Sequence, residues 1–269
     1  MRLTRLLAAL CMMLLPVVAA TPASAAQNGY VRLAHLSPDT PEVDVYFSSF
    51  SGRTKVFPGV SYATVSPYQG VGAGRYTVAM RAPGSPADSD PLLSTTLQVE
   101  GGKSYTVAGV GPRSSVELKV LDDDLSRPAT GTARMRVVQA SASADTVDVA
   151  TTTGIAIADD IIFPSTTGYT EVPARAWTLQ ATSAQGERAV RTVDVRAGAI
   201  YTVLVLDRQE GSGLRLSVLA DAAGAGQVPT GAVRAGGAGA SPWLGVAVLL
   251  TLAALLLALR SPGRSPARG

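Results

Sequence analysis

The chain has 269 residues, of which 16% are charged, and its 27 glycines and 17 prolines favour strands and turns over a helical bundle. Its formal net charge of +3 is typical of proteins that bind polyanions, but five terminal arginines account for it: Arg2, Arg5, Arg260, Arg264 and Arg268. Without them the remaining chain carries −2, which argues against nucleic acid as a partner.

Residues 1–26 are predicted to be a secretory signal peptide. Two arginines precede an apolar run from Leu6 to Ala20, and small residues follow it, so cleavage is expected after Ala25 or Ala26. A membrane helix that stays in the chain is the less favoured alternative, because the run is short and contains Pro16. The only cysteine, Cys11, lies in this segment, so the mature chain has no thiol for disulfides or metal binding.

Two stretches of the chain are internal repeats of each other. Residues 32–45 align without a gap with residues 136–149. Later matches keep the same order, pairing Tyr68 with Tyr169, Gly102-x-x-Tyr105-Thr106-Val107 with Gly198-x-x-Tyr201-Thr202-Val203, and the segment ending at Asp123 with the one ending at Asp221. Repeats of this length are domain-sized. We therefore predict a first domain at 27–124, a linker at 125–132 and a second domain at 133–221.

Each repeat is predicted to fold as about seven short strands. Val116, Leu118 and Val120 alternate with polar residues, as in a strand with one buried face. Residues 199–206 are apolar and rich in β-branched side chains, as in a central strand. Turn residues such as Gly101-Gly102 separate these runs. The predicted fold class is all-β, with two tandem immunoglobulin-like, Greek-key β-sandwich domains.

The first repeat also resembles a known family. It contains Arg32-Leu-Ala-His35-Leu-Ser37-Pro38-Asp39-x-Pro41-x-Val43-Asp44-Val45-Tyr46, followed by Gly74-x-Tyr76 and Gly102-x-x-Tyr105-Thr-Val107. On these motifs it is similar to the bacterial surface family called domain of unknown function 4397. The second repeat keeps Val147-Asp148-Val149 but has Gln139 in place of His35. The resemblance implies secreted or anchored β-domains of bacteria, and it implies no activity.

His35 is the residue that invites a catalytic interpretation. It is the sole histidine, and Asp39 and Asp44 lie close to it in sequence. A hydrolase would pair such a histidine with a serine nucleophile and an acid, but no G-x-S-x-G motif presents a serine. We predict that His35 hydrogen-bonds a turn and that the protein is not an enzyme. A cell-surface hydrolase that uses His35 is the alternative.

Cofactor and metal sites are not predicted. One histidine and no mature cysteine are too few ligands for a transition metal, and Gly70 to Gly74 lacks the Lys-Ser/Thr of a phosphate-binding loop. Calcium needs only oxygen ligands, and acids cluster at Asp122-Asp123-Asp124, Asp88-x-Asp90 and Asp159-Asp160. None has the spacing of a calcium loop. We favour a solvated turn at 122–124, and a calcium-stiffened adhesin is a further alternative.

The C-terminal part is predicted to hold the protein in a membrane. Residues 222–241 are rich in Gly and Ala, which is typical of a flexible stalk. Trp243 to Leu259 is free of charge and follows Pro242, so we predict a transmembrane helix at 242–259 rather than a buried core helix. The basic tail at 260–269 places the C-terminus in the cytoplasm by the positive-inside rule.

Together these features predict a non-enzymatic, single-pass protein of the bacterial cell membrane with both N-terminal domains outside the cell. The two domains would serve binding, adhesion or envelope structure, with an extracellular protein or a glycan as partner. Repeat-matched aromatic residues are expected to pack in the cores rather than to line a glycan groove; they are Tyr68, Tyr76, Tyr105, Trp177 and Tyr201.

Overall fold

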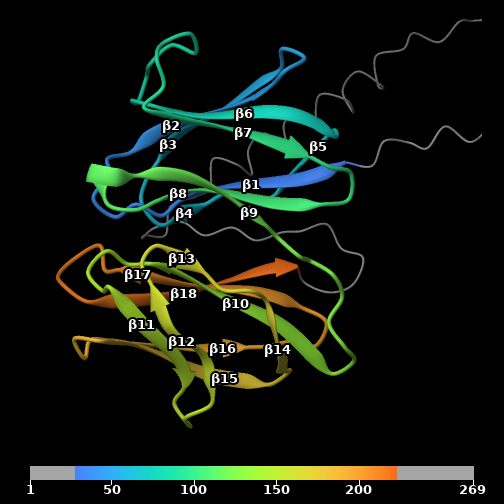
Figure 1. The fold of residues 1–269 in the computed structure, drawn as a ribbon. Coiled ribbons are helices and arrows are strands. Elements are labelled where there is room, and N and C mark those ends of the chain that lie inside the picture. The colour runs from blue at the N-terminus through green and yellow to red at the C-terminus, as the bar shows by residue number, and fades with distance from the viewer. Residues whose placement is uncertain (1–27, 223–269) are drawn as a thin grey trace, which may run out of the picture. The chain divides into compact units, whose positions relative to one another are not determined.

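The computed structural model describes residues 28–222, which form strands and their connections (Figure 1). The predicted signal peptide, the predicted membrane helix and the tail lie outside the described residues, and so does the predicted stalk beyond Ala222. Within residues 28–222 no helix is long and apolar enough to cross a membrane. The helical element there is a 3-10 turn at Arg113–Ser115.

The first repeat folds into two sheets. One has the strand order β4-β1-β8-β9, with β5 also paired to β1, and the other has the order β3-β2-β6-β7. The strands are β1 (Gly29–His35), β2 (Val43–Ser49), β3 (Thr54–Val60), β4 (Thr64–Val65), β5 (Gln69–Val71), β6 (Gly74–Arg81), β7 (Leu93–Val99), β8 (Ser104–Val110) and β9 (Glu117–Asp122).

The second repeat has the same arrangement, strand for strand. Its sheets have the orders β13-β10-β17-β18, with β14 also paired to β10, and β12-β11-β15-β16. The strands are β10 (Thr132–Ala140), β11 (Thr146–Thr151), β12 (Ala156–Ile162), β13 (Ser165–Thr166), β14 (Thr170–Pro173), β15 (Ala176–Ser183), β16 (Arg188–Asp194), β17 (Ile200–Asp207) and β18 (Leu214–Ala222).

Each pair of sheets encloses an apolar core, so the all-β prediction and the prediction of β-sandwiches are confirmed. The first core includes Val45, Val78 and Val107, and the second includes Val149, Leu179 and Val203. In each case the three residues come from both sheets, as sandwich packing requires. Alternation along the strands puts these apolar side chains on the inner faces.

The strand order corrects the immunoglobulin-like part of the prediction. In an immunoglobulin sandwich the first and second strands share a sheet. Here β1 and β2 lie in different sheets, and β1 pairs in parallel with β8. The second repeat repeats this parallel pair with β10 and β17. The chain therefore crosses from one sheet to the other between the first two strands of each sandwich.

The two five-stranded sheets pack against each other through their outer faces. Leu33 of β1 points into the first core, whereas its neighbour Ala34 lines a small gap together with Leu204 of β17. Because both faces of the sheets are covered, every residue of β8 is buried, and so is every residue of β17 except Asp207. This double burial explains the nearly continuous apolar sequence at 199–206.

Candidate functional site

His35 braces the turn that follows β1. Its side chain is buried, its Nε2 lies 3.2 Å from the Pro41 carbonyl oxygen, and its Nδ1 accepts the amide N–H of Ser37 at 3.4 Å. Accepting at Nδ1 requires the neutral imidazole with its proton on Nε2. Burial lowers the pKa of His35, while the hydrogen bond to Pro41 acts in the opposite direction. Backbone groups of the turn therefore use both ring nitrogens.

Gln139 has the same position and the same role in the second sandwich. Its Nε2 donates to the Ala144 carbonyl at 2.8 Å, and its Oε1 accepts the amide N–H of Ser141 at 3.0 Å. An amide that cannot titrate thus bonds the turn as the imidazole does, at the matching amide and at a carbonyl one position earlier than the one that His35 contacts. The structure gives His35 the predicted turn role. Within residues 28–222, neither hydrogen bond of the ring is made with a serine hydroxyl.

The acidic run Asp122-Asp123-Asp124 is solvated at Asp122 and Asp124 but not at Asp123, which corrects the sequence interpretation for that residue. Asp122 is exposed, Asp123 is 5% exposed and faces the second sandwich, and Asp124 accepts a hydrogen bond from Arg134 at 2.8 Å. The three carboxylates point to different surroundings because successive residues of an extended chain alternate in direction. Within residues 28–222 no group of three or more histidine, cysteine or acidic residues is placed to hold a metal ion.

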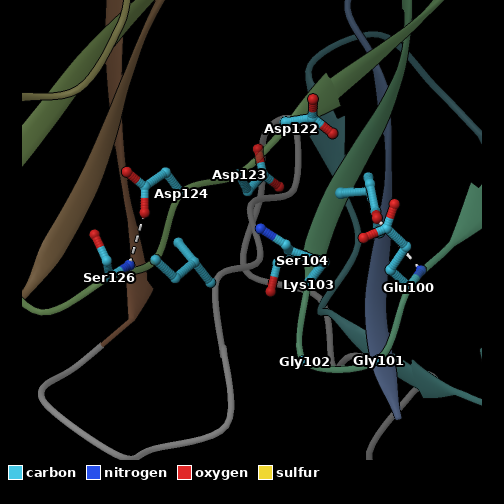
Figure 2. A pocket seen from close by; sticks show the side chains of 11 residues that line it. Glu100, Gly101, Gly102, Lys103, Ser104, Asp122, Asp123, Asp124 and Ser126 are labelled. Atoms are coloured by element: carbon cyan, nitrogen blue, oxygen red, sulfur yellow. Dashed lines mark hydrogen bonds between the residues drawn. The ribbon is translucent and has the colours of Figure 1, made fainter. Parts of the chain in front are cut away.

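A cavity of about 570 Å³ lies next to these acids, between residues 100–105 and 122–126 (Figure 2). Its lining carries Glu100, Asp122, Asp123 and Asp124 against a single lysine, Lys103. Hydrogen bonds from Arg134 and then from Ser126 hold the pKa of Asp124 well below its usual range. The cavity is therefore acidic in character, but two of its carboxylates, those of Asp123 and Asp124, already have hydrogen-bond partners.

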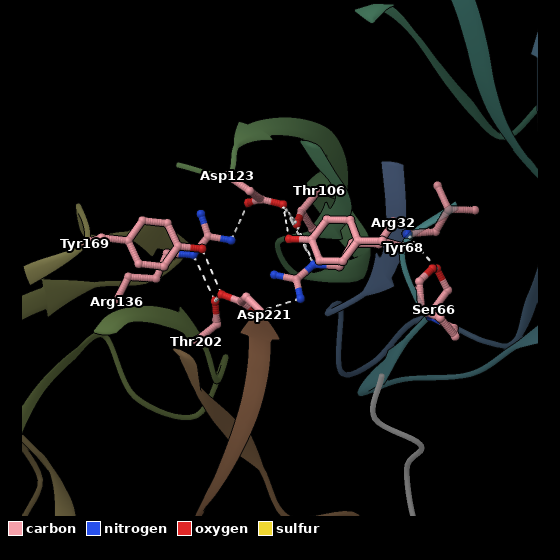
Figure 3. A network of polar contacts seen from close by, with 11 residues as sticks. Arg32, Ser66, Tyr68, Thr106, Asp123, Arg136, Tyr169, Thr202 and Asp221 are labelled. Atoms are coloured by element: carbon pink, nitrogen blue, oxygen red, sulfur yellow. Dashed lines mark hydrogen bonds and ion pairs between the residues drawn. The ribbon is translucent and has the colours of Figure 1, made fainter. Parts of the chain in front are cut away.

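The principal polar site lies between the sandwiches, where two half-sites of the same composition meet (Figure 3). In the half built by the first sandwich, Arg32 Nε donates to Thr106 Oγ1 at 2.7 Å. Thr106 in turn donates to Asp123 Oδ2 at 2.6 Å. Tyr68 donates to the same oxygen at 2.6 Å, and the Arg32 guanidinium lies over the Tyr68 ring, 4.6 Å from its centroid.

The second sandwich repeats every one of these contacts. Arg136 Nε donates to Thr202 Oγ1 at 3.0 Å, and Thr202 donates to Asp221 Oδ2 at 2.6 Å. Tyr169 donates to that oxygen at 2.8 Å, and the Arg136 guanidinium lies 4.6 Å from the Tyr169 ring centroid. The four residues of each half-site thus occupy equivalent positions in the two repeats.

The arginines cross between the sandwiches. Arg32 of the first sandwich donates to Asp221 of the second at 2.7 Å, and Arg136 of the second donates to Asp123 of the first. The four charged side chains are at most 5% exposed. Two cations and two anions are therefore buried together, with each charge paired across the boundary between the sandwiches.

Burial and these pairings determine the charge state of the site. Burial raises the pKa of Tyr68 and of Tyr169 far above that of a free tyrosine, so both hydroxyls stay protonated and donate. Burial would lower the pKa of Arg32, but the Asp221 carboxylate, with Tyr68 and Asp123, outweighs it and the pKa is raised. The two arginines thus stay charged and the two tyrosines keep their donor hydrogens over the ordinary range of pH.

Further hydrogen bonds join the sandwiches at the edge of this network. The Tyr62 hydroxyl donates to the Ala140 carbonyl at 3.3 Å and accepts the amide N–H of Asp207 at 2.8 Å. Lys119 Nζ donates to the Pro164 carbonyl at 3.3 Å. These contacts involve one loop or strand from each repeat, and together with the crossed arginines they limit rotation of one sandwich against the other.

The prediction that the repeat-matched aromatic residues pack in the two cores is correct for some of them and wrong for Tyr68. Tyr105, Trp177 and Tyr201 are core residues as predicted. Tyr68 is buried between the sandwiches instead. The signal that could have shown this was available: arginine, threonine and aspartate recur at matched positions within otherwise apolar strands of both repeats, and a buried charge needs a partner.

Comparison with known proteins finds a family model that matches the N-terminal part of the chain. Residues 29–150 match the family model "Domain of unknown function (DUF4397)", so the resemblance predicted from the motifs of the first repeat is confirmed over these residues. The match covers the first sandwich and extends into β11 of the second. No curated protein sequence matches the chain.

Solved structures with some similarity come from several bacteria. The Bacillus anthracis TIE protein has 10% identity and a TM-score of 0.24 over 67% of this chain, and the chain covers 34% of that protein's length. A CBM26 module of Eubacterium rectale Amy13K in complex with maltoheptaose has 12% identity, a TM-score of 0.24, and coverage of 72% and 97%. The tip fimbrial protein Mfa3 of Porphyromonas gingivalis has 8% identity, a TM-score of 0.20, and coverage of 71% and 98%. Similarity at this level carries no functional argument.

Proposed function

We propose that this protein is a non-enzymatic bacterial surface protein that presents its two β-sandwiches as one rigid unit outside the membrane, for binding, adhesion or envelope structure. The observation that carries the proposal is the reciprocal pairing of Arg32 with Asp221 and of Arg136 with Asp123. Tandem domains move against each other by default when their interface is small and polar. Here a relative rotation would separate buried opposite charges.

The network supports a rigid unit more than it supports high stability. Burying four charges removes their hydration, and this cost offsets much of the attraction between them. Breaking a single pair is nevertheless strongly unfavourable, because it leaves a buried charge without a partner. A defined orientation of the two sandwiches is therefore the property that such a network provides. A rigid spacer or a binding surface that spans both sandwiches would use it.

The support for the proposed membrane attachment comes from the sequence. The signal peptide at 1–26, the stalk at 222–241, the uncharged span at 242–259 and the basic tail at 260–269 together describe export followed by a stop in the membrane. The extracellular side would carry the sandwiches, and the basic tail would lie in the cytoplasm.

Protease treatment of intact cells tests the topology. A tag on the C-terminal tail and an antibody against the sandwiches are followed by immunoblot, with a cytoplasmic protein as the control for lysis. We expect the protease to remove the sandwiches from intact cells and to leave a small tagged fragment. Sandwiches that the protease reaches only after lysis would contradict a surface location.

Distance measurements in the full chain test the rigid unit. Thr96 and Thr192 are exposed residues of β7 and β16, and the only native cysteine, Cys11, lies in the predicted signal peptide. Spin labels on T96C and T192C therefore report one distance across the two sandwiches. We expect a narrow distance distribution that broadens when Asp123 and Asp221 are both changed to Asn. A broad distribution with the network intact would contradict the proposal.

A further inference from the structure

Arg81, the last residue of β6, is a buried cation with two unsatisfied donors. The residue is 9% exposed. Its Nη2 donates to the Ala87 carbonyl at 2.8 Å, but Nε and Nη1 are buried and have no hydrogen-bond partner among the residues that the structure describes. Buried donors are almost always paired in folded proteins, and a guanidinium is well suited to bind a carboxylate. Arg81 is therefore a candidate residue for binding a ligand.

The loop at 82–92 covers Arg81 and is fastened by two residues of β2. Asp44 Oδ2 accepts the amide N–H of Gly84 at 2.8 Å, and the Tyr46 hydroxyl donates to the Ser85 carbonyl at 2.6 Å. The Arg81 guanidinium also lies over the Tyr46 ring, 5.1 Å from its centroid. Most of the loop itself is exposed, so a few hydrogen bonds separate Arg81 from solvent.

The nearest acids do not neutralise Arg81 by hydrogen bonds. Asp44 is its cross-strand neighbour in the β2–β6 pair, yet its two carboxylate oxygens accept the amides of Gly59 and Gly84. Asp88 and Asp90 belong to the covering loop and are exposed, so water screens their charge. A ligand with its own carboxylate would supply the acceptors that Nε and Nη1 lack.

The second sandwich has no counterpart of this arrangement. Thr182 takes the place of Arg81 opposite Asp148, and Ala150 aligns with Tyr46. Between β15 and β16 the chain makes a short turn at 184–187 instead of a loop of the length of 82–92. The buried arginine, the tyrosine and the long loop thus occur together in one repeat and are missing together in the other, as expected of parts of one site.

The sheet face next to Arg81 is rich in neutral hydrogen-bonding groups. The outer face of β3-β2-β6-β7 is fixed by the strand registers, and its hydroxyl and amide side chains are Ser48, Thr54, Thr77, Ser94, Thr96 and Gln98. Thr54, Ser94, Thr96 and Gln98 are exposed. Hydroxyl-rich ligands can exchange their hydrogen bonds with water for hydrogen bonds with such a face.

We propose that Arg81 is the centre of a site for the carboxylate of an acidic sugar, with the rest of the glycan lying along the outer face of β3-β2-β6-β7. The carboxylate enters below the loop at 82–92 as this loop lifts from Asp44 and Tyr46, and it accepts hydrogen bonds from the guanidinium. The hydroxyl and amide side chains of the sheet then bind the sugar hydroxyls. The binding test uses purified protein, so its outcome does not depend on whether the proposed membrane attachment is correct.

The test measures binding of D-glucuronate to the purified full chain in detergent micelles, with D-glucose and N-acetylglutamate as comparison ligands. We expect glucuronate to bind and to shift the NMR signal of the Arg81 Nε–H, glucose to bind more weakly, and N-acetylglutamate to show that a carboxylate alone is insufficient. The variant R81T, which carries the residue found at the equivalent position of the second sandwich, should bind glucuronate at least about tenfold more weakly. R191Q is the matched control, because Arg191 is an exposed arginine of β16 in the second sandwich and lies outside the proposed face.

Several outcomes would overturn the proposal. These are no binding of glucuronate, unchanged binding by R81T, or equal loss of binding in R191Q. Equal binding of N-acetylglutamate would overturn the assignment to a sugar. If R81T does not fold, the Nε–H signal of the wild-type protein decides: a signal that glucuronate does not shift contradicts the site.

Discussion

Arg32 and Asp221 are 189 positions apart in the chain, and their side chains form a buried ion pair at 2.7 Å. The equivalent residues of the other repeat, Arg136 and Asp123, form the reciprocal pair. Each sandwich therefore contributes one cation and one anion to a contact with two-fold character. A duplicated domain can meet its copy in this way because a self-complementary surface needs only one set of residues.

Replacing Asp221 by Asn should destabilise the protein strongly. The change leaves the Arg32 guanidinium buried without its counter-charge, and breaking one partner of such a pair costs about 3 kcal/mol or more. Urea unfolding measures the effect. Asp194→Asn is the matched control, because Asp194 pairs with Arg196 at the surface, 3.6 Å apart with both side chains largely exposed, and exposed pairs contribute little. Equal unfolding midpoints for the two variants would contradict the importance of the network.

Removing either tyrosine hydroxyl of the network should have similar effects. Tyr68→Phe deprives Asp123 of one donor and Tyr169→Phe does the same for Asp221. A hydrogen bond to a charged group contributes about 1.5–3 kcal/mol, so we expect each change to lower the free energy of unfolding by this order. In the control Tyr76→Phe, the lost hydroxyl donates to an exposed carbonyl, that of Gly72, and the free energy should change little. A large difference between the two network variants would argue against equivalent half-sites.

The strands and their repetition could be predicted from the sequence, whereas the order of the strands could not. Alternation at Val116, Leu118 and Val120 predicts a strand with one buried face. The structure has the strand β9 from Glu117 on, in which Leu118 packs against the first core while Val120 is 38% exposed. Alternation does not show which strand lies beside it. The parallel neighbours β1 and β8 are separated by most of the repeat, and their pairing depends on contacts between distant residues.

The candidate sites could likewise be predicted from the sequence only in part. The repeat alignment matches Arg32 with Arg136 and Asp123 with Asp221, but it does not distinguish pairing within a sandwich from pairing between sandwiches. In the structure Arg32 Nε is 3.9 Å from Asp123 of its own sandwich and Nη1 is 2.7 Å from Asp221 of the other. Only the packing of the two sheets decides between these partners. The burial of Arg81 could not be predicted from the sequence, because the loop that covers it has the composition of an ordinary connection rich in Pro and Gly.

The stability of the protein should depend on pH through His35. Burial lowers the pKa of His35 in the folded protein below its ordinary value of 6.5. As the pH falls through about 6.5, the unfolded chain takes up a proton at this position and the folded chain does not. The free energy of unfolding should therefore decrease from there until the lower pKa of the folded state is reached. Urea unfolding between about pH 7.5 and about pH 5.5 measures it, because carboxylates titrate mostly below this window.

His35→Gln should remove this dependence without loss of the fold. Gln139 already makes the equivalent two hydrogen bonds in the second sandwich, so the amide can replace the neutral imidazole. We expect the variant to match the wild type near pH 7.5 and to exceed it near pH 5.5, as the sign of the shift requires. A variant whose stability falls as steeply as that of the wild type would show that another group carries the titration.

Each sandwich has a β-bulge, between β2 and β3 in the first and between β11 and β12 in the second. A residue of left-handed backbone conformation lies at each bulge. Gly59 has a φ of 62° and donates its amide to Asp44, and Asp160 has a φ of 51° and donates its amide to Asp148. Left-handed backbone costs a residue with a side chain about 1 kcal/mol, and glycine avoids this cost.

Asp160→Gly should therefore raise the melting temperature, and Gly59→Ala should lower it. The space around Gly59 would accept a Cβ, since the nearest atom, in the Glu42 side chain, is 3.5 Å away. The loss in Gly59→Ala would thus come from the backbone and not from a clash. Thermal unfolding of both variants is the measurement, and a melting temperature that falls in Asp160→Gly would show that the Asp160 side chain stabilises the bulge by more than the strain costs.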